Sequence, residues 1–285
     1  MPTFATPEPV SLVLELAVGD VAVTATDRLD TVVLVRPKDA SHDPDVRAAE
    51  ATRVEFAAGR LLVTTPNRRR TGLFGRAGAI EVTVELPTGS QLRADAYVAA
   101  LRCRGRLGEC RIRTGVGDLA LEVTGALDLS TGAGAVVVDH VQGRAEVGTG
   151  SGALRVGVID GAALVKNSNG DVWIGRVGGD VRVQASNGDI AVDRAQAGVD
   201  ARTANGDVRI GEVARGVTAL RTAMGVIEVG VSAGTAARLD VNTRFGTVHN
   251  ELDAAEGPAP SDETVEVTAR TSYGDIVIRR RPAAE

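Results

Sequence analysis

The sequence predicts an all-β fold, a parallel β-solenoid of two-strand coils, each about eighteen residues long, with an irregular N-terminal β region capping the first coil. Three observations support this. Glycine recurs at a nearly constant spacing between Gly117 and Gly225. Apolar residues alternate with variable ones after each of these glycines. Aromatic residues make up only 2% of the 285 residues while glycine accounts for 34 of them, which suits a narrow core lined by small aliphatic side chains.

The recurring glycines, called marker glycines below, each open a similar short motif such as Gly-Asp-Val. They are Gly117, Gly134, Gly152, Gly170, Gly188, Gly206, Gly225, Gly246 and Gly274. The spacing is most regular in the middle of the series and lengthens in its last two steps, from Gly225 to Gly246 and from there to Gly274. Nine markers at this spacing predict roughly nine stacked coils.

Each marker glycine is followed by an apolar residue two positions on and another four positions on, with Asn250 as the one break. This alternation is the period-two pattern of a strand with one buried face. The second half of each unit repeats it, as at Val181 and Val183. Neither strand can bury its apolar face alone, so we expect successive units to stack as parallel strands and to align Val172, Ile190 and Val208 inside the core.

Extending the period backward by one unit places Ala99 where a marker glycine would stand. Cys103 and Cys110 then occupy inward positions that hold Val, Leu or Ile in other coils. Their spacing is too wide for a Cys-x-x-Cys metal site, and no histidine lies near them. We therefore expect two buried free thiols, since unpaired cysteine behaves as a small buried apolar residue.

Residues 1–98 form the expected N-terminal β region and cap, and residues 99–285 the expected solenoid, most simply as one continuous unit. The strand candidates before residue 98 are Val10–Leu16, Asp20–Ala25, Thr31–Val35, Val54–Ala57, Arg60–Thr65 and Ala79–Leu86. A polar segment, 37–51, separates two of them, and we expect antiparallel or mixed pairing here. Residues 251–263 contain two prolines and five acidic residues, which predicts an inserted loop. Arg279, Arg280 and Arg281 place charge on the final strand, as would suit an exposed edge.

The recurring Asn-Gly-Asp turns raise the question of calcium, because nonapeptide β-rolls also use eighteen residues per turn. Calcium needs six to eight oxygen ligands, whereas four marker glycines are followed by Ala, Ala, Val and Thr instead of Asp. We favour a structural role, in which Asn and Gly accept left-handed backbone angles and Asp bonds nearby amides of its own turn. The turn residues concerned are Asn169, Gly170, Asp171, Asn187, Gly188, Asp189, Asn205, Gly206 and Asp207.

Two features are candidates for an interaction surface. The first is a basic loop with Arg68, Arg69, Arg70 and Phe74, which could dock an acidic partner or a membrane surface, or simply be a mobile solvated loop. The second is Trp173, the single tryptophan, at an outward strand position where it marks an interaction face or is covered by another segment.

No catalytic arrangement is visible, because the three histidines are scattered and no Gly-x-Ser-x-Gly motif occurs. We expect no enzyme activity, cofactor or metal. The net charge of −5 does not favour nucleic acid, and no stretch is apolar enough to span a membrane. The N-terminal residues lack the pattern of a signal peptide, so a cytoplasmic protein is expected, as a monomer or a small homo-oligomer with an unknown protein partner.

The repeats "TGVGDLAL", "NSNGDVWI", "ASNGDIAV", "TANGDVRI" and "TSYGDIVI" resemble those of the bacterial "putative-adhesin" β-strand-repeat family, a domain of unknown function. The resemblance covers about residues 10–280 and implies a β-solenoid without a defined catalytic site. Our leading expectation is a non-catalytic, adhesin-like binding or scaffold protein. The alternatives are a self-assembling scaffold like the bactofilins and a calcium-dependent surface adhesin.

Overall fold

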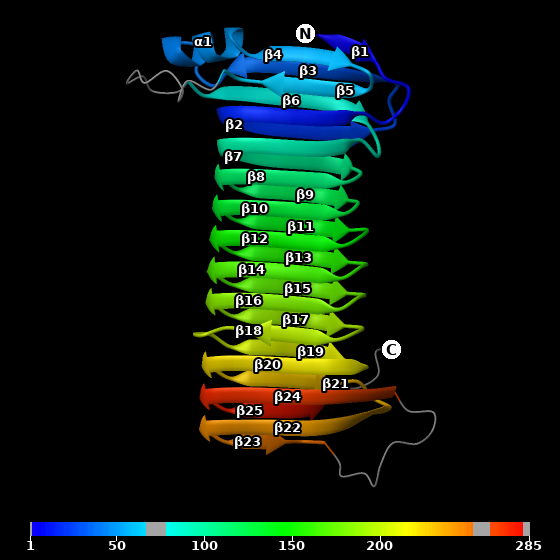
Figure 1. The fold of residues 1–285 in the computed structure, drawn as a ribbon, viewed down its shortest axis with the longest axis vertical. Coiled ribbons are helices and arrows are strands. Elements are labelled where there is room, and N and C mark those ends of the chain that lie inside the picture. The colour runs from blue at the N-terminus through cyan, green and yellow to red at the C-terminus, as the bar shows by residue number, and fades with distance from the viewer. Residues whose placement is uncertain (1, 67–77, 253–262, 282–285) are drawn as a thin grey trace. The chain divides into compact units, whose positions relative to one another are not determined.

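The computed structural model describes residues 2–66, 78–252 and 263–281. The chain forms two compact units, Met1–His140 and Val141–Glu285. Each is built largely from parallel strands that wind in successive coils, which confirms the predicted β-solenoid (Figure 1). The division predicted between residues 98 and 99 stays a prediction; that position lies within one long strand, β7 (Gln91–Arg106).

The first unit begins with a mixed β region, as expected. Three of its strand pairs, β1–β3, β3–β6 and β4–β5, are antiparallel. One long strand, β2, joins two of the predicted strands and runs parallel to β5, β6 and β7. The other elements of this unit are β1 (Thr3–Ala5), β2 (Ser11–Thr26), β3 (Asp30–Pro37), α1 (Asp43–Glu50), β4 (Arg53–Ala57), β5 (Arg60–Thr64), β6 (Ile80–Pro87), β8 (Cys110–Val116), β9 (Leu119–Thr124), β10 (Leu127–Ala133) and β11 (Val136–Val141), which ends at the first residue of the second unit.

The short helix α1 was not predicted within the polar segment 37–51. Proline stands in its first turn beside Asp43 and Asp45, both of which suit a helix N-terminus. The buried Asp45 carboxylate accepts hydrogen bonds from the Ala79 N–H at 2.9 Å and the Asp39 N–H at 3.2 Å. The Ala79 N–H and then the His42 ring lower the pKa of Asp45. The helix therefore depends on a tertiary anchor rather than on an apolar face.

The predicted cysteine environment is confirmed, since Cys103 and Cys110 are both free and buried. Each lies at an inward strand position: Cys103 pairs with Leu121 of β9, and Cys110 pairs with Leu127 of β10. Burial raises the pKa of Cys103 well above its usual range and raises that of Cys110 to about 12. Both side chains therefore remain neutral thiols and act as core residues.

The second unit contains the most regular coils. Val172, Ile190 and Val208 are successive register partners, as predicted, and each is at most 1% exposed. Burying such a side chain contributes about 1.5–3 kcal/mol, so the column stabilises the stack at every coil. The strands are β12 (Ala145–Ser151), β13 (Leu154–Ile159), β14 (Ala163–Asn169), β15 (Val172–Val177), β16 (Val181–Asn187), β17 (Ile190–Ala195), β18 (Val199–Arg202), β19 (Val208–Val213), β20 (Gly216–Met224), β21 (Ile227–Val231), β22 (Thr235–Phe245), β23 (Val248–Asn250), β24 (Glu263–Tyr273) and β25 (Ile276–Arg280).

The last coil in sequence is not the last coil in space. Strand β24 pairs with β20 on one side and with β22 on the other, and β25 lies between β21 and β23 (Figure 1). The prediction that Arg279, Arg280 and Arg281 guard an exposed final strand is therefore wrong. The two long steps between marker glycines, which end at Gly246 and Gly274, reflect this arrangement, because they include the chain needed to place β22–β23 first and then return to the intervening layer.

Candidate functional site

The marker glycines all have backbone angles that other residues rarely adopt. Their φ values lie between +126° and +159°. A Cβ atom on Gly188 would lie 2.2 Å from the carbonyl oxygen of Gly170, the equivalent residue of the preceding coil. Both the local angle and the close approach of neighbouring coils therefore require glycine.

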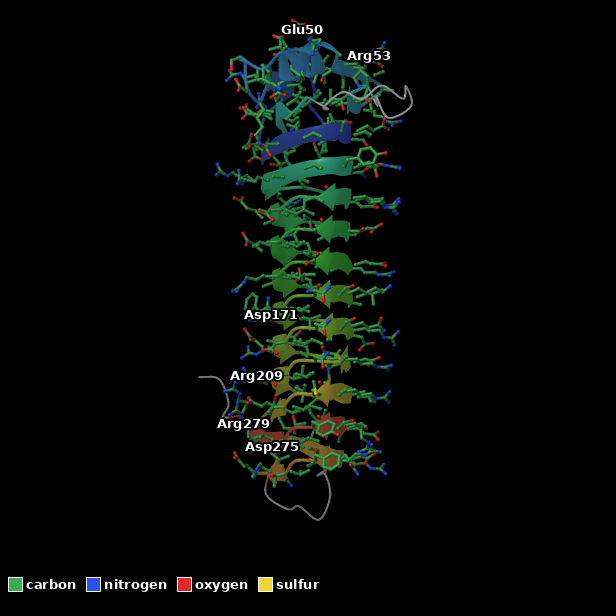
Figure 2. All side chains as sticks on the ribbon, turned by 90° about the vertical axis from the view of Figure 1, so that its left-hand side faces the viewer. Glu50, Arg53, Asp171, Arg209, Asp275 and Arg279 are labelled. Carbon is green, nitrogen blue, oxygen red and sulfur yellow. The ribbon has the colours of Figure 1, made fainter. Side chains whose placement is uncertain are left out.

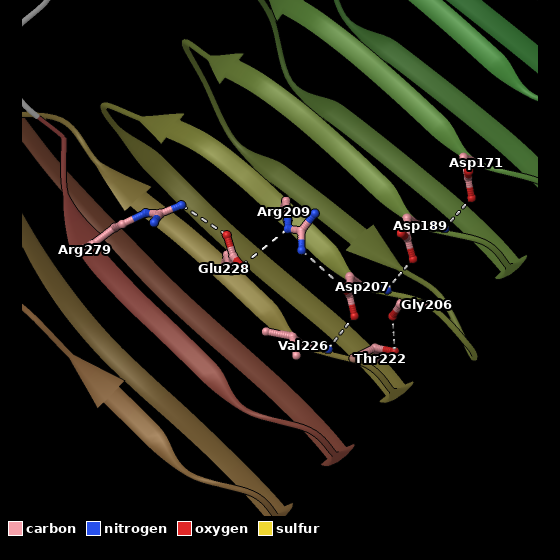
Figure 3. Close-up of polar contacts among 9 residues, drawn as sticks. All are labelled: Asp171, Asp189, Gly206, Asp207, Arg209, Thr222, Val226, Glu228 and Arg279. Carbon is pink, nitrogen blue, oxygen red and sulfur yellow. Dashed lines mark hydrogen bonds and ion pairs between the residues drawn. The ribbon is translucent and has the colours of Figure 1, made fainter.

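The aspartates of the turns connect one coil to the next (Figure 3). The Asp189 N–H donates to Asp171 Oδ1 at 3.0 Å, and the Asp207 N–H donates to Asp189 Oδ1 at 2.8 Å. Where the series loses its aspartate, the Val226 N–H still donates to Asp207 Oδ1 at 2.8 Å. The prediction that these carboxylates bond amides of their own turn is therefore wrong. They bond the following coil instead, because coil stacking places its equivalent amide directly beside them.

The asparagines form a second ladder beside the aspartates. The Asn187 Nδ2 donates to Asn169 Oδ1 at 2.9 Å, and the Asn205 Nδ2 donates to Asn187 Oδ1 at 2.8 Å. All nine turn residues singled out from the sequence are thus brought together as three adjacent stacked corners, linked by the pairings of β14, β16 and β18 and of β15, β17 and β19. The side chains of these turns therefore hold successive coils together.

These corners lack the geometry of a metal site. Within residues 2–66, 78–252 and 263–281, no three His, Cys, Asp or Glu side chains gather in an arrangement that could hold an ion. Each of Asp171, Asp189 and Asp207 already uses one oxygen to accept a backbone N–H from the next coil. The observed role of these carboxylates is to join successive coils.

A threonine column, which was not predicted, supports the same corners from inside. Thr222 Oγ1 donates to the carbonyl oxygen of Gly206 at 2.9 Å, and Thr271 Oγ1 donates to that of Gly225 at 3.1 Å. Asn167 takes the equivalent role, with Nδ2 donating to the Gly152 carbonyl at 3.1 Å. The available signal was a threonine three positions before the marker glycine, which occurs in seven of the nine units.

Trp173 projects from an outward position of β15 and is half-buried. The Arg155 guanidinium lies 5.1 Å from the centre of its ring, within the range of a cation–π contact. Its Nε1 donates to Asp193 Oδ1 at 3.3 Å. A Cβ on Gly175 would lie only 3.1 Å from the indole, so the absence of a side chain there lets the ring lie along the sheet. The indole is therefore held in place between a cation and an anion on an outward face of the second unit.

Charged residues continue along this face. Arg209 contacts Asp207 at 3.4 Å and Glu228 at 3.4 Å, and Glu228 also contacts Arg279 at 3.1 Å (Figure 3). Arg209, Arg279 and Asp275 follow Asp171 down one side of the second unit (Figure 2). Arg279 is thus a member of an ion-pair network between coils, and its neighbours show why the final strand in sequence is an interior layer.

A second outward cluster was not predicted. Met224, Tyr273 and Phe245 are each more than half exposed, and they are register partners on β20, β24 and β22. The rings of Phe245 and Tyr273 stack with centres 4.9 Å apart and planes 11° apart. Each residue immediately precedes a marker glycine, the position held by asparagine in the three preceding coils. Sequence alignment of the units could have found the position, but not the spatial order that stacks the rings.

The predicted basic surface with Arg68, Arg69, Arg70 and Phe74 lies outside the described residues. No helix in the part of the chain that the structure describes is both long and apolar enough to cross a membrane.

Comparison with solved structures gives relatives of low identity. A "putative adhesin" from Parabacteroides merdae ATCC 43184 is 9% identical, with a TM-score of 0.42, over 98% of this chain and 95% of that one. A "putative adhesin" from Bacteroides fragilis NCTC 9343 is 10% identical, with a TM-score of 0.36, over 98% and 95%. A protein from Parabacteroides distasonis ATCC 8503, described as "putative lipid binding", is 11% identical, with a TM-score of 0.35, over 98% and 95%.

No curated protein matches this chain in sequence. A family model does match, and its description is Toastrack DUF4097. The match extends over residues 11–283 and thus includes both compact units and all the turns described above. The chain belongs to the Toastrack DUF4097 family.

Proposed function

We propose that this protein is a non-catalytic, adhesin-like binding module whose coils hold a contact surface centred on Trp173. The observation that carries the proposal is the fixed indole between Arg155 and Asp193 on an outward face. Tryptophan and arginine are enriched among the residues that dominate binding energy. An indole already held in one orientation loses little conformational freedom when a partner packs on it.

The chemistry of the described residues supports a binding role over catalysis. The buried cysteines are held as neutral thiols by their raised pKa values, so neither offers a reactive thiolate near neutral pH. Hydrolysis of polysaccharides or esters by the purified protein, abolished by one point substitution, would overturn the non-catalytic part of the proposal.

The binding role is tested by affinity capture from the native cell, followed by measurement of the dissociation constant for the captured component. We expect Trp173→Ala to weaken binding at least tenfold, about 1.4 kcal/mol. Val277→Ala, at the equivalent outward position of β25, is the matched control and leaves the constant unchanged. Equal binding by wild type and Trp173→Ala would remove Trp173 from the contact surface.

Calcium dependence is tested separately, because acidic turns recur at the coil spacing although the described corners gather no three ligands for an ion. A resident ion would stabilise the native state and raise the melting temperature. We expect the same melting temperature in calcium and in chelator; a rise with calcium that Asp189→Asn abolishes would favour a calcium-dependent adhesin instead. A cytoplasmic location likewise stays a prediction, which fractionation of the native cell tests.

A further inference from the structure

The second unit ends in a coil with one open edge. Strand β22 pairs with β24 and strand β23 pairs with β25. On their other sides, β22 and β23 pair with no strand in the described ranges (Figure 1). An edge of this kind presents unpaired backbone N–H and C=O groups that can add a strand from another chain.

The interior of the coil is also open at this edge. Leu239 and Val241 are only half-buried, and Val248 is 39% exposed. Their partners one layer inward, such as Val267 and Ile276, are fully buried. In sequence, the stretch 253–262 carries no apolar side chain larger than alanine or proline. Among the described residues, the edge therefore combines unpaired backbone with a partly exposed apolar cross-section, a combination that marks an interaction site.

The charges on β22 match a second copy of the same strand. Arg238, Asp240, Asn242 and Arg244 alternate with the inward residues and are exposed. An antiparallel pairing centred on Asn242 sets Asp240 of each chain opposite Arg244 of the other, so two opposite-charge pairs form. Among the described residues, no carboxylate pairs with Arg244, whereas Asp240 contacts Arg270 at 2.6 Å.

We propose that two copies of this chain form a two-fold symmetric dimer by antiparallel pairing of their β22 edges about Asn242. Such pairing joins the β22 edges of the two copies and closes, so it forms a dimer and not a filament. The same contact covers Leu239 and Val241 of each copy. This dimer is independent of the Trp173 surface, which lies on another strand of the unit.

Cysteine cross-linking tests the pairing directly. At the centre of an antiparallel pair the two Cα atoms lie about 4.5–5.5 Å apart, within the range of a disulfide. Under mild oxidation Asn242→Cys is expected to give a disulfide-linked dimer. The matched control, Gln184→Cys, lies on an exposed outward position of the interior strand β16 and is expected to stay monomeric under the same conditions. The native cysteines are buried and do not take part.

Sedimentation equilibrium tests the charge register. Arg244→Glu places a carboxylate opposite Asp240 of the second copy and is expected to raise the dimer dissociation constant about tenfold. Adding Asp240→Lys to the same chain restores an opposite-charge pair and the original dissociation constant. Lys166→Glu, at an exposed position of interior strand β14, leaves it unchanged. The proposal is overturned by a wild-type chain that is monomeric at about 1 mM. Equal cross-linking at positions 242 and 184 overturns it as well. Both results count against the dimer even if the β22 edge is then found to bind a different protein. A dimer insensitive to Arg244→Glu overturns the Asn242-centred register.

Discussion

Substitution of a marker glycine should be the most damaging small change in the turns. Gly188→Ala places a residue at φ +131° and a Cβ 2.2 Å from the Gly170 carbonyl oxygen. Holding a non-glycine residue in this region costs about 1–3 kcal/mol. Displacing packed neighbours to make room costs about 1–3 kcal/mol more. The free energy of unfolding should therefore fall by roughly 2–6 kcal/mol.

Two comparison variants separate these contributions. Gly234→Ala also has a positive φ, +75°, but its Cβ would meet no atom within 4 Å, so only the backbone cost of about 1–2 kcal/mol applies. Asp189→Ala removes the acceptor for the Asp207 N–H, a solvent-accessible hydrogen bond whose loss costs about 1 kcal/mol. The expected order of damage is Gly188→Ala first, followed by the two comparison variants.

Urea unfolding provides the assay, with fluorescence of the single tryptophan as the signal. Trp173 lies on β15 and pairs with Ala191 of β17, the strand that follows the Gly188 turn, so it reports on the affected coils. With a denaturant slope of about 1–3 kcal/mol/M, Gly188→Ala should lower the midpoint by roughly 0.7 M or more. A midpoint for Gly188→Ala equal to that of Gly234→Ala would refute the argument that close coil approach requires glycine.

Three further outcomes follow from the described contacts. Cys103 and Cys110 should resist Ellman's reagent until the protein unfolds. Because the folded pKa values of both thiols are raised, the stability linked to them is present below the unfolded value of 9.0 and declines as the pH rises toward about 12. Cys110→Ala should lessen this decline in alkaline denaturation curves. Because the folded pKa of Asp45 is lowered, the stability that this carboxylate provides is present above the unfolded value of 3.8 and is lost as the pH falls through the folded pKa. The Asp45→Asn variant should lose this acid dependence in urea titrations. Glu228→Gln should reduce stability by less than about 1 kcal/mol, since its ion pairs are solvent-accessible, and a loss of several kcal/mol in the same assay would contradict this.

The candidate surface was predictable only in part. The outward position of Trp173 follows from alternation along β15, since Val172 and Ile174 on either side point inward. Its partners Arg155 and Asp193 lie on the adjacent strands β13 and β17, in the preceding and the following coil. Alternation gives the face of a residue but not the rotamer that brings the guanidinium over the indole. The stacked Phe245 and Tyr273 were missed for a related reason, because they are neighbours only through the spatial order of the coils.

The sequence by itself determined the coil. Regular glycines and alternating Val, Ile and Leu specify two-strand units, their inward face and their register, because a shift by one residue would expose every apolar side chain. Only the tertiary structure decided which way the turn carboxylates bond and the order of the final layers. Both depend on contacts between coils: Asp189 reaches the equivalent amide of the next coil, and β24 lies between β20 and β22. The repeat pattern is the same for either order, so the choice is made by packing between layers.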